Sequence, residues 1–305
     1  MATHKETILF TMDRLYESVE KKGPVCVGLD TASSYIPPRE LRRSASHAEA
    51  VLAFNKALID ATVDVAACFK VQIAYYEALG VVGLEVYAKT LRYIREKSAL
   101  VIADVKRGDI ADTAVQYAKA HFYGDFSADF VTLSPYMGMD SLEPWFSFAE
   151  KAGKGAFVLM RTSNPGRCDF QEREFVGGDR LWEAVGAKLS VLAEKHRGSY
   201  GYGAFGAVVG CTTNEAGYAR QRFAPLFFLI PGFGAQGGTA KDIALLLKDG
   251  NGGVVNASRS ILTAWTKSAD AESAAVTADN AFAASAARNA VLRMRDEIRR
   301  ETASV

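Results

Sequence analysis

Short runs of apolar residues recur along the chain, and longer segments with helical spacing of apolar and polar residues separate them. Eight runs rich in Val, Ile, Leu and Phe stand out. Apolar runs of this length are typical of strands buried on both faces of a parallel sheet. The runs cover residues 25–30, 65–71, 99–105, 129–133, 156–161, 205–210, 226–231 and 253–257.

The segments between these runs have the length and amphipathic pattern of helices. They predict helices near residues 47–63, 81–97, 110–122, 141–151, 180–196, 214–222 and 239–248, and a final helix near 278–301. We interpret this final helix as an outer packing helix rather than a membrane-binding or calmodulin-binding face. Eight strand–helix pairs are typical of an α/β fold of the (β/α)8 TIM-barrel type. We therefore expect residues 1–305 to form a single barrel domain, with an N-terminal lead-in helix before it and the final helix packed against it.

Two connections are longer than the others. Residues 31–46 follow the first predicted strand, and residues 164–179 follow the fifth. In a barrel the loops after the strands build the active-site face, so either extended loop could form a lid. The alternative is a decorated surface loop, and the pattern alone does not distinguish the two.

The composition excludes several classes of partner. Lys and Arg number 36 against 35 Asp and Glu, a net charge of +1 without a long basic block, so nucleic acid is not an expected partner. The apolar runs are far shorter than the roughly 20 residues of a membrane span, and the N-terminus lacks the apolar segment of a signal peptide. We therefore expect no membrane partner and a cytoplasmic location.

The cysteines and histidines do not form a recognisable site. The four cysteines lie dozens of residues apart, without C-x-x-C or paired histidine spacing, so neither a disulfide framework nor a zinc site is expected. No G-x-S-x-G occurs, which leaves a serine hydrolase unsupported. The sequence thus predicts no metal, and its chemistry must come from other residues.

The densest group of candidate catalytic residues follows the third predicted strand. Alternation along a strand places Asp104 and Lys106 on one face, at the mouth of the barrel. Asp109 is expected to open the following helix, and Thr113 shares its face. The alternative interpretation is a helix cap with a structural ion pair. That alternative does not explain a second lysine in the barrel.

This second lysine, Lys70, ends the apolar second strand, where an unpaired charge would be costly to bury. Its expected partners are Asp104 and Asp109. Alternating acids and lysines would keep one another ionised, because each opposite charge stabilises the charged form of its neighbour. Asp30 ends the first strand at the same rim, although a lone Asp after a strand is more often a turn or cap residue.

A glycine-rich segment at residues 231–239 follows the seventh strand, and it contains Gln236, Gly237 and Gly238. Glycines let backbone N–H groups approach an anion, so phosphate is the expected guest. After the eighth strand, Arg259 can donate to phosphate oxygens. GFGAQG also matches a dinucleotide-binding pattern, but no acidic residue ends the following strand to hold a ribose.

Six segments combine these features with neighbouring residues: CVGLD (26–30), FKVQ (69–72), DVKRGDIADT (104–113), RTSNPG (161–166), PGFGAQGG (231–238) and NASR (256–259). Together, in this order, they resemble the orotidine 5′-monophosphate decarboxylase family, and specifically its longer bacterial-type branch. The D-x-K-x-x-D core alone is shared with related sugar-phosphate enzymes. The long segments after the first and fifth strands depart from the family pattern.

The resemblance implies decarboxylation of orotidine 5′-monophosphate to uridine 5′-monophosphate in de novo pyrimidine biosynthesis, without a cofactor. It implies that Lys106 protonates C6 and that Asp104 lies against the departing carboxylate. It also implies a homodimer, in which Asp109 and Thr113 reach the site of the other subunit. The remaining implied contacts are Asp30 and Lys70 at the ribose, Ser163 at the pyrimidine, Gln236 between base and phosphate, and Gly237, Gly238 and Arg259 at the phosphate. Pro165 is a further candidate substrate-binding residue.

Two alternative functions remain open. A related sugar-phosphate decarboxylase or aldolase would bind magnesium through the carboxylates of the D-x-K-x-x-D segment. Ser163 and Gln236 favour a pyrimidine over that substrate class. A non-catalytic barrel would bind a phosphorylated metabolite without converting it.

Overall fold

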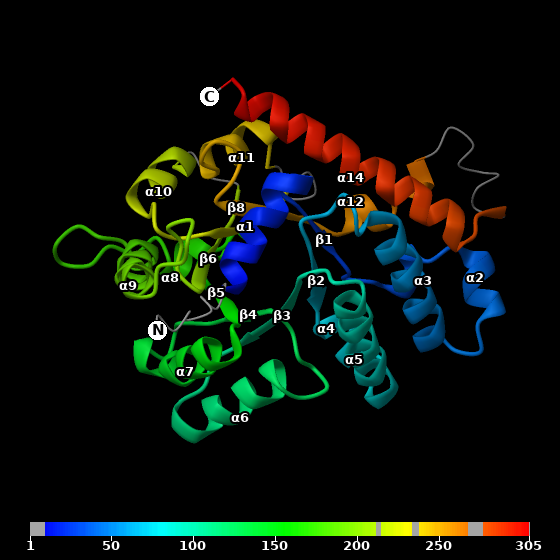
Figure 1. Ribbon diagram of the computed structural model, residues 1–305, viewed down its shortest axis with the longest axis horizontal. Helices are drawn as coiled ribbons and strands as arrows, with labels where there is room; N and C mark the ends of the chain where they lie inside the picture. The colour runs from blue at the N-terminus through cyan, green and yellow to red at the C-terminus, as the bar shows by residue number, and fades with distance from the viewer. Residues whose placement is uncertain (1–9, 212–214, 234–237, 268–276, 305) are drawn as a thin grey trace, which may run out of the picture.

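Eight parallel strands form a closed barrel in which each strand pairs with its neighbours in sequence and β1 pairs with β8 (Figure 1). The computed structural model describes residues 10–211, 215–233, 238–267 and 277–304. The closed ring of parallel strands confirms the predicted TIM barrel. The strands are β1 (Val25–Gly28), β2 (Cys68–Gln72), β3 (Val101–Arg107), β4 (Phe130–Leu133), β5 (Gly155–Arg161), β6 (Phe205–Val209), β7 (Phe228–Pro231) and β8 (Gly253–Ala257).

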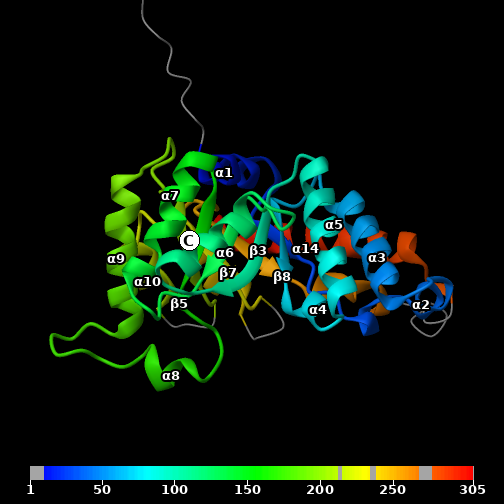
Figure 2. The ribbon, with the colours of Figure 1, turned by 90° about the horizontal axis from the view of Figure 1, so that it is seen from below.

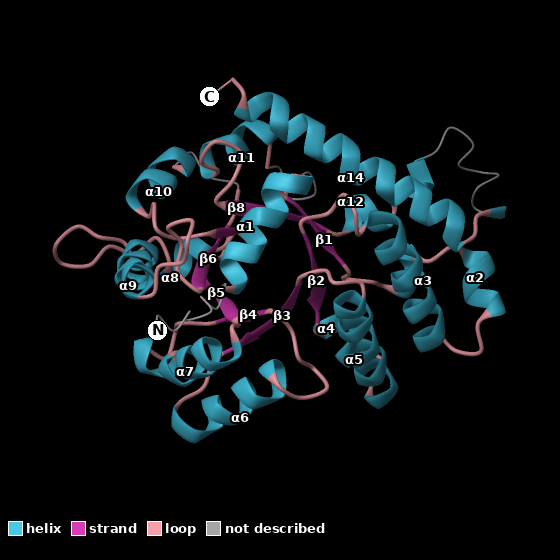
Figure 3. Cartoon of the chain, viewed as in Figure 1, coloured by secondary structure: helices cyan, strands magenta, loops and turns pink. Residues whose placement is uncertain are grey.

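Helices surround the barrel, and each predicted helix is present with bounds that shift by a few residues (Figure 3). The last one packs outside the barrel against two of the others. These helices are α3 (His47–Thr62), α5 (Val81–Glu96), α6 (Ala111–Phe122), α7 (Glu143–Ala152), α9 (Leu181–Lys195), α10 (Ala216–Arg222), α11 (Ala240–Leu246) and α14 (Asn280–Thr302), the last packing on α3 and α11.

Several helices of one or two turns were not predicted. They are too short to show a helical period, so their segments resemble loops in the sequence. They are α2 (Pro38–Arg43), α4 (Ala74–Glu77), α8 (Arg167–Phe170), α12 (Arg259–Leu262) and the 3-10 turns η1 (Ser33–Tyr35), η2 (Met139–Ser141) and η3 (Ala264–Lys267). Among the described residues, no helix combines the length and apolar character needed to cross a membrane.

The N-terminal helix α1 (Thr11–Lys22) lies across the barrel at the end where the strands begin (Figure 1). Its buried Met12, Leu15 and Val19 pack with the side chains that fill the barrel interior. Those side chains include Phe130 and Phe157, whose ring centroids are 5.2 Å apart. Because this end of the barrel is filled, the opposite end is left for polar groups.

The two long connections both lie at the carboxyl ends of the strands. The connection after β1 contains η1 and α2, and Trp265 Nε1 donates a hydrogen bond of 2.9 Å to the Tyr35 carbonyl. The connection after β5 contains α8, which lies at the opposite end of the molecule from α1 (Figure 2). Both connections therefore border the face where a barrel enzyme binds its substrate. Whether either one closes as a lid stays a prediction.

We expect Leu15→Ala to lower the free energy of unfolding by about 2–5 kcal/mol, because it leaves a cavity where α1 meets the barrel interior. Leu15 is fully buried. Urea unfolding followed by circular dichroism measures the change. Lys21→Ala, an exposed position on the same helix, is the control and should change the value by less than about 0.5 kcal/mol. Equal effects of the two variants would contradict this account of the helix.

Candidate active site

A buried lysine lies between two carboxylates at the carboxyl end of the barrel. Lys70 Nζ is 3.0 Å from Asp30 Oδ1 and 2.9 Å from Asp104 Oδ2. Only 5% of the Lys70 side chain is exposed, against 9% for Asp104. β2 brings Lys70 to this place, while β3 contributes Asp104 and the end of β1 leads into Asp30. The three residues come from consecutive strands, so the pairing of β1 with β2 and of β2 with β3 places them side by side.

Lys106 adds a second, partly exposed lysine to this group of charges. We call Lys70, Asp104 and Lys106 the array. The Nζ of Lys106 is 2.6 Å from Asp104 Oδ1, and 47% of its side chain is exposed. The backbone at Lys106 has a positive φ of 43°, a conformation that non-glycine residues adopt at a cost, and β3 shifts register with β4 between Ala103 and Arg107. The local backbone is therefore held away from regular strand geometry at this position.

Thr132 of β4 stabilises that distortion, and sequence reasoning did not identify it. Its Oγ1 accepts hydrogen bonds from the backbone N–H groups of Val105 and Lys106, at 3.0 and 2.9 Å, and donates one of 2.9 Å to Asp104 Oδ1. One hydroxyl thus positions both the acid and the exposed lysine. The signal available in the sequence was a single polar residue in an otherwise apolar strand.

Opposite charges keep the array ionised. Burial raises the pKa of Asp104, but the ammonium groups of Lys70 and Lys106 outweigh this effect and hold that pKa well below its usual range. Burial lowers the pKa of Lys70, yet the carboxylates of Asp104 and Asp30 raise it above its ordinary value. Asp104 is therefore a carboxylate and Lys70 an ammonium at neutral pH.

Asn256 of β8 and Ser258, which follows this strand, bring further polar side chains to the larger cavity. Ser258 Oγ donates a hydrogen bond of 2.8 Å to Asp30 Oδ2. A side chain at Gly28 would place its Cβ 2.0 Å from that Oγ, so glycine is needed there. Asn256 is buried, and its Oδ1 has no hydrogen-bond partner among the described residues, which makes it an available acceptor. Sequence reasoning included both residues in a motif but gave neither a part in the site.

Two adjoining cavities open onto the array. The larger is about 500 Å³ and the smaller about 250 Å³. Both are lined by Lys70, Asp104, Lys106, Pro231 and Asn256. The larger cavity extends to Arg259, Gly232 and Tyr35, and the smaller one to Ser163, Leu159 and Val208. The charged array therefore lies between a polar lobe that ends at an arginine and a lobe with apolar walls.

The structure brings most predicted site residues together. Asp30, Lys70, Asp104, Lys106 and Arg259 line the larger cavity, and Ser163 lines the smaller one. Gly238 lies against Cys211 at the end of β6, where any added Cβ would collide with Sγ. Gln236 and Gly237 lie outside the described residues.

Three predicted residues lie apart from these cavities in the described chain. Asp109 does not pair with Lys70, whose partners are Asp30 and Asp104. Its Oδ1 instead accepts a hydrogen bond of 2.8 Å from the Ile110 N–H, and α6 begins only at Ala111. Thr113 is exposed on α6, and Pro165 is exposed in the loop after β5.

Comparison with known proteins gives a consistent result. The model of a family described as Orotidine 5′-phosphate decarboxylase / HUMPS family matches residues 23–274. An orotidine 5′-phosphate decarboxylase of Clostridium perfringens is 54% identical over 288 residues, which is 94% of this chain and 97% of that protein. The Clostridium acetobutylicum protein of the same name is 53% identical over 290 residues, 95% of this chain and 99% of that protein. The solved structure of Leishmania donovani OMP decarboxylase aligns with a TM-score of 0.71 at 29% identity, covering 97% of this chain and 100% of that one.

The pH dependence of stability should report the charge on Asp104. Because its pKa is lowered in the folded protein, the stabilisation is fully present above the unfolded pKa of about 3.9 and is lost as the pH falls toward the folded pKa. The difference in unfolding free energy between the protein and Asp104→Asn should therefore stay constant between about pH 5 and 8. It should narrow below about pH 4 in urea unfolding measured across this range.

Asp109→Asn is the control for that experiment, because this carboxylate accepts a hydrogen bond from a backbone N–H rather than from an ammonium group. Its difference from the unsubstituted protein should be small throughout. If the difference in unfolding free energy between the unsubstituted protein and Asp104→Asn grew as the pH fell, the proposed ionisation of Asp104 would be contradicted.

Proposed function

This chain belongs to the orotidine 5′-phosphate decarboxylase / HUMPS family, and we propose that the array of Lys70, Asp104 and Lys106 is where it converts orotidine 5′-monophosphate to uridine 5′-monophosphate. It is a carboxy-lyase. The observation that carries the assignment of the site is the ammonium–carboxylate–ammonium arrangement at the junction of the two cavities.

The shape and polarity of the cavities support one orientation of the nucleotide. The phosphate binds at Arg259 in the larger cavity, which Gly232 and Phe233 of the glycine-rich segment also line. Gly238, Gln236 and Gly237 stay the contacts expected from the sequence, and the last two lie outside the described residues. The ribose lies at Asp30 and Lys70. The pyrimidine enters the smaller cavity, where Leu159 and Val208 contact its faces and Ser163 bonds its polar edge. Pro165 lies two residues after Ser163 in the same loop and is exposed there, and we propose that it contacts the bound substrate.

The chemistry that this placement supports is electrostatic. The bond between C6 and the carboxylate breaks, carbon dioxide leaves, and the electron pair remains on C6. The Lys106 ammonium stabilises the developing negative charge and delivers a proton to that carbon, leaving a neutral amine that regains a proton from solvent. A fixed charge aimed at a site of developing charge contributes several kcal/mol. Asp104 is held ionised and faces the substrate carboxylate, while binding energy at the phosphate holds the two together.

The metal-dependent alternative has less support from the donor groups. A magnesium ion would need carboxylate oxygens with free lone pairs facing one point. The oxygens of Asp30 and Asp104 instead converge on Lys70 Nζ, at 3.0 and 2.9 Å. An ammonium therefore occupies the position that a cation would take between these two acids.

A homodimer that shares its sites is the assembly we propose. Ile110, next to Asp109 in the chain, is 51% exposed, and Tyr136 and Met137, which follow the adjacent strand β4, are 83% and 51% exposed. Large apolar side chains gathered on a surface favour burial against a partner. A second copy covering this surface would bring its Asp109 and Thr113 toward the neighbouring array.

The cytoplasm is the compartment we propose. Cys26 and Cys68 are adjacent in register on β1 and β2, and both are free thiols. Reduced cysteines are the state that a cytoplasm maintains.

Lys106→Ala should lower kcat/KM for orotidine 5′-monophosphate by at least about 10³-fold, because it removes both the proton donor and the positive charge. Binding of uridine 5′-monophosphate, measured by calorimetry, should stay largely intact, since Arg259 and Ser163 are unchanged. Loss of substrate absorbance measures the rate. Lys119→Ala, an exposed lysine on α6, is the control and should retain normal activity. A near-normal rate for Lys106→Ala would remove Lys106 from the mechanism.

Mixed dimers test whether Asp109 acts across the interface. Neither Lys106→Ala nor Asp109→Ala homodimers should turn over substrate at an appreciable rate. A heterodimer of the two holds one site with both residues intact, so it should recover about half the activity of the unsubstituted dimer. Activity assays on affinity-purified heterodimers measure the recovery. An inactive heterodimer would count against sharing.

A further inference from the structure

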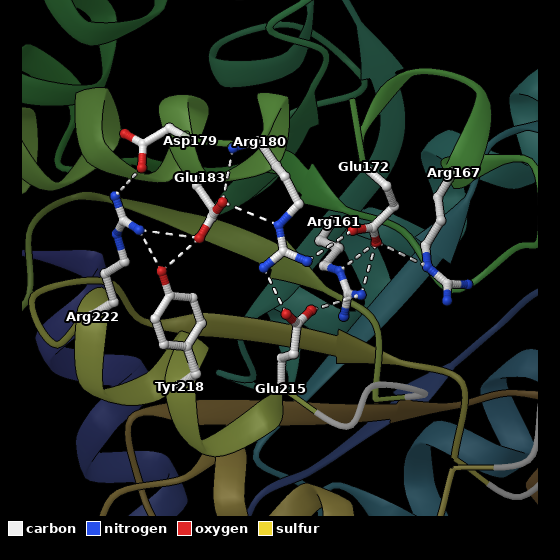
Figure 4. A network of polar contacts seen from close by, with 9 residues as sticks. All are labelled: Arg161, Arg167, Glu172, Asp179, Arg180, Glu183, Glu215, Tyr218 and Arg222. Carbon is white, nitrogen blue, oxygen red and sulfur yellow. Dashed lines mark hydrogen bonds and ion pairs between the residues drawn. The ribbon is translucent and has the colours of Figure 1, made fainter. Parts of the chain in front are cut away.

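A second charged network joins the end of β5 to α9 and α10, two of the helices outside the barrel (Figure 4). None of its residues lines the two cavities at the array of Lys70, Asp104 and Lys106. It contains four arginines and four acids with one tyrosine, so its formal charges balance. The members are Arg161, Arg167, Glu172, Asp179, Arg180, Glu183, Glu215, Tyr218 and Arg222. The mechanism proposed above uses none of them, although Arg161 opens the RTSNPG segment.

Arg161 connects this network to the active-site loop. It is the last residue of β5, and 7% of its side chain is exposed. Its Nε and Nη2 atoms donate to Glu172 Oε1 at 2.9 and 2.8 Å, and Nη2 lies 3.2 Å from Glu215 Oε2. Glu172 Oε2 also accepts a hydrogen bond of 3.3 Å from Arg180 Nη1. A buried guanidinium that donates to two carboxylates is fixed in orientation, because turning away from either one would leave a buried N–H group without an acceptor.

Thr162 and Gln171, the chain neighbours of Arg161 and Glu172, form a second pair of contacts between the same two segments. The Thr162 N–H donates a hydrogen bond of 2.8 Å to Gln171 Oε1, and Gln171 Nε2 donates one of 2.9 Å to Thr162 Oγ1. Two consecutive residues after α8 therefore bind two consecutive residues at the end of β5. We call these contacts, between Arg161 and Thr162 on one side and Gln171 and Glu172 on the other, the clasp.

The residue directly after the clasp is Ser163, which lines the smaller cavity. Its backbone is confined from the other side by Gly210, at the end of β6. An added Cβ on Gly210 would lie 2.8 Å from both the backbone N and the Cβ of Ser163, and the Gly210 N–H donates a hydrogen bond of 2.8 Å to the Arg161 carbonyl. Ser163 is thus held between the clasp and the adjacent strand.

We propose that the clasp positions Ser163 for recognition of the pyrimidine base, so that Arg161, Gln171 and Glu172 are positioning residues for base binding. The inference rests on the proposed function, because it requires a pyrimidine nucleotide in the smaller cavity. It predicts a selective defect: disrupting the clasp weakens binding of ligands that carry the base and leaves binding of the sugar phosphate unchanged. A segment that served stability alone would show no such selectivity.

Binding of two ligands to Glu172→Ala tests the proposal. Uridine 5′-monophosphate carries the base, and ribose 5-phosphate lacks it. We expect the dissociation constant of uridine 5′-monophosphate to rise about tenfold, the loss typical of one misplaced hydrogen bond, and that of ribose 5-phosphate to change less than about twofold. Gln171→Ala removes one pair of clasp contacts without removing a charge and should show the same selectivity. It provides the measurement if Glu172→Ala does not fold.

Asp179→Ala is the matched control. It breaks the 2.7 Å contact with Arg222 at the outer end of the same network and leaves the contacts of Arg161 in place. Both dissociation constants should stay unchanged.

A double-mutant cycle with Ser163→Ala gives a second readout. If the clasp acts through Ser163, adding Glu172→Ala to Ser163→Ala should weaken uridine 5′-monophosphate binding less than about twofold further. Equal weakening of both ligands by the clasp variants, unchanged binding of both, or full additivity with Ser163→Ala would overturn the proposal. Failure of the unsubstituted protein to bind uridine 5′-monophosphate would instead overturn the proposed function.

Discussion

The charge of Lys70 sets the main constraint on this end of the barrel. An ammonium that is almost completely buried must be neutralised by close partners, and Asp30 and Asp104 supply them from the two neighbouring strands. Each acid then needs support of its own, which Ser258 gives to Asp30 and Thr132 gives to Asp104. The array is therefore a chain of mutually dependent contacts, and it leaves one partly exposed cation, Lys106, directed at the cavity.

Barrel closure makes this chain of contacts possible. Asp30 and Ser258 are separated by most of the sequence. The pairing of β1 with β8 nevertheless places Ser258 Oγ 2.8 Å from Asp30 Oδ2. At the opposite end, Met12, Leu15 and Val19 of α1 pack with interior side chains that include Phe130 and Phe157. The two ends of the barrel interior therefore differ: apolar side chains fill one end, and the charged array with its two cavities lies at the other.

The two charged networks differ in what surrounds them. The array at Lys70 opens onto a cavity and has an exposed member, whereas Arg161 is enclosed and oriented by two acids. β5 lies between them: its Leu159 lines the smaller cavity, and its Arg161 binds the outer network. A single strand therefore connects the electrostatics outside the barrel to the loop that borders the candidate base-binding lobe.

Sequence alone determined the barrel, the order of its elements and the local groups such as Asp104 with Lys106, because buried strands, amphipathic helices and two-residue alternation are properties of neighbouring residues. It also indicated that Lys70 needs acidic partners. Tertiary structure decided which acids these are: Asp30 takes the place expected for Asp109, since strand adjacency rather than sequence distance brings side chains together. The contributions of Thr132 and of the contacts of Arg161 likewise depend on hydrogen bonds and ion pairs between residues of different segments. A linear pattern does not encode such distances, and only the closed barrel brings these groups within reach of one another.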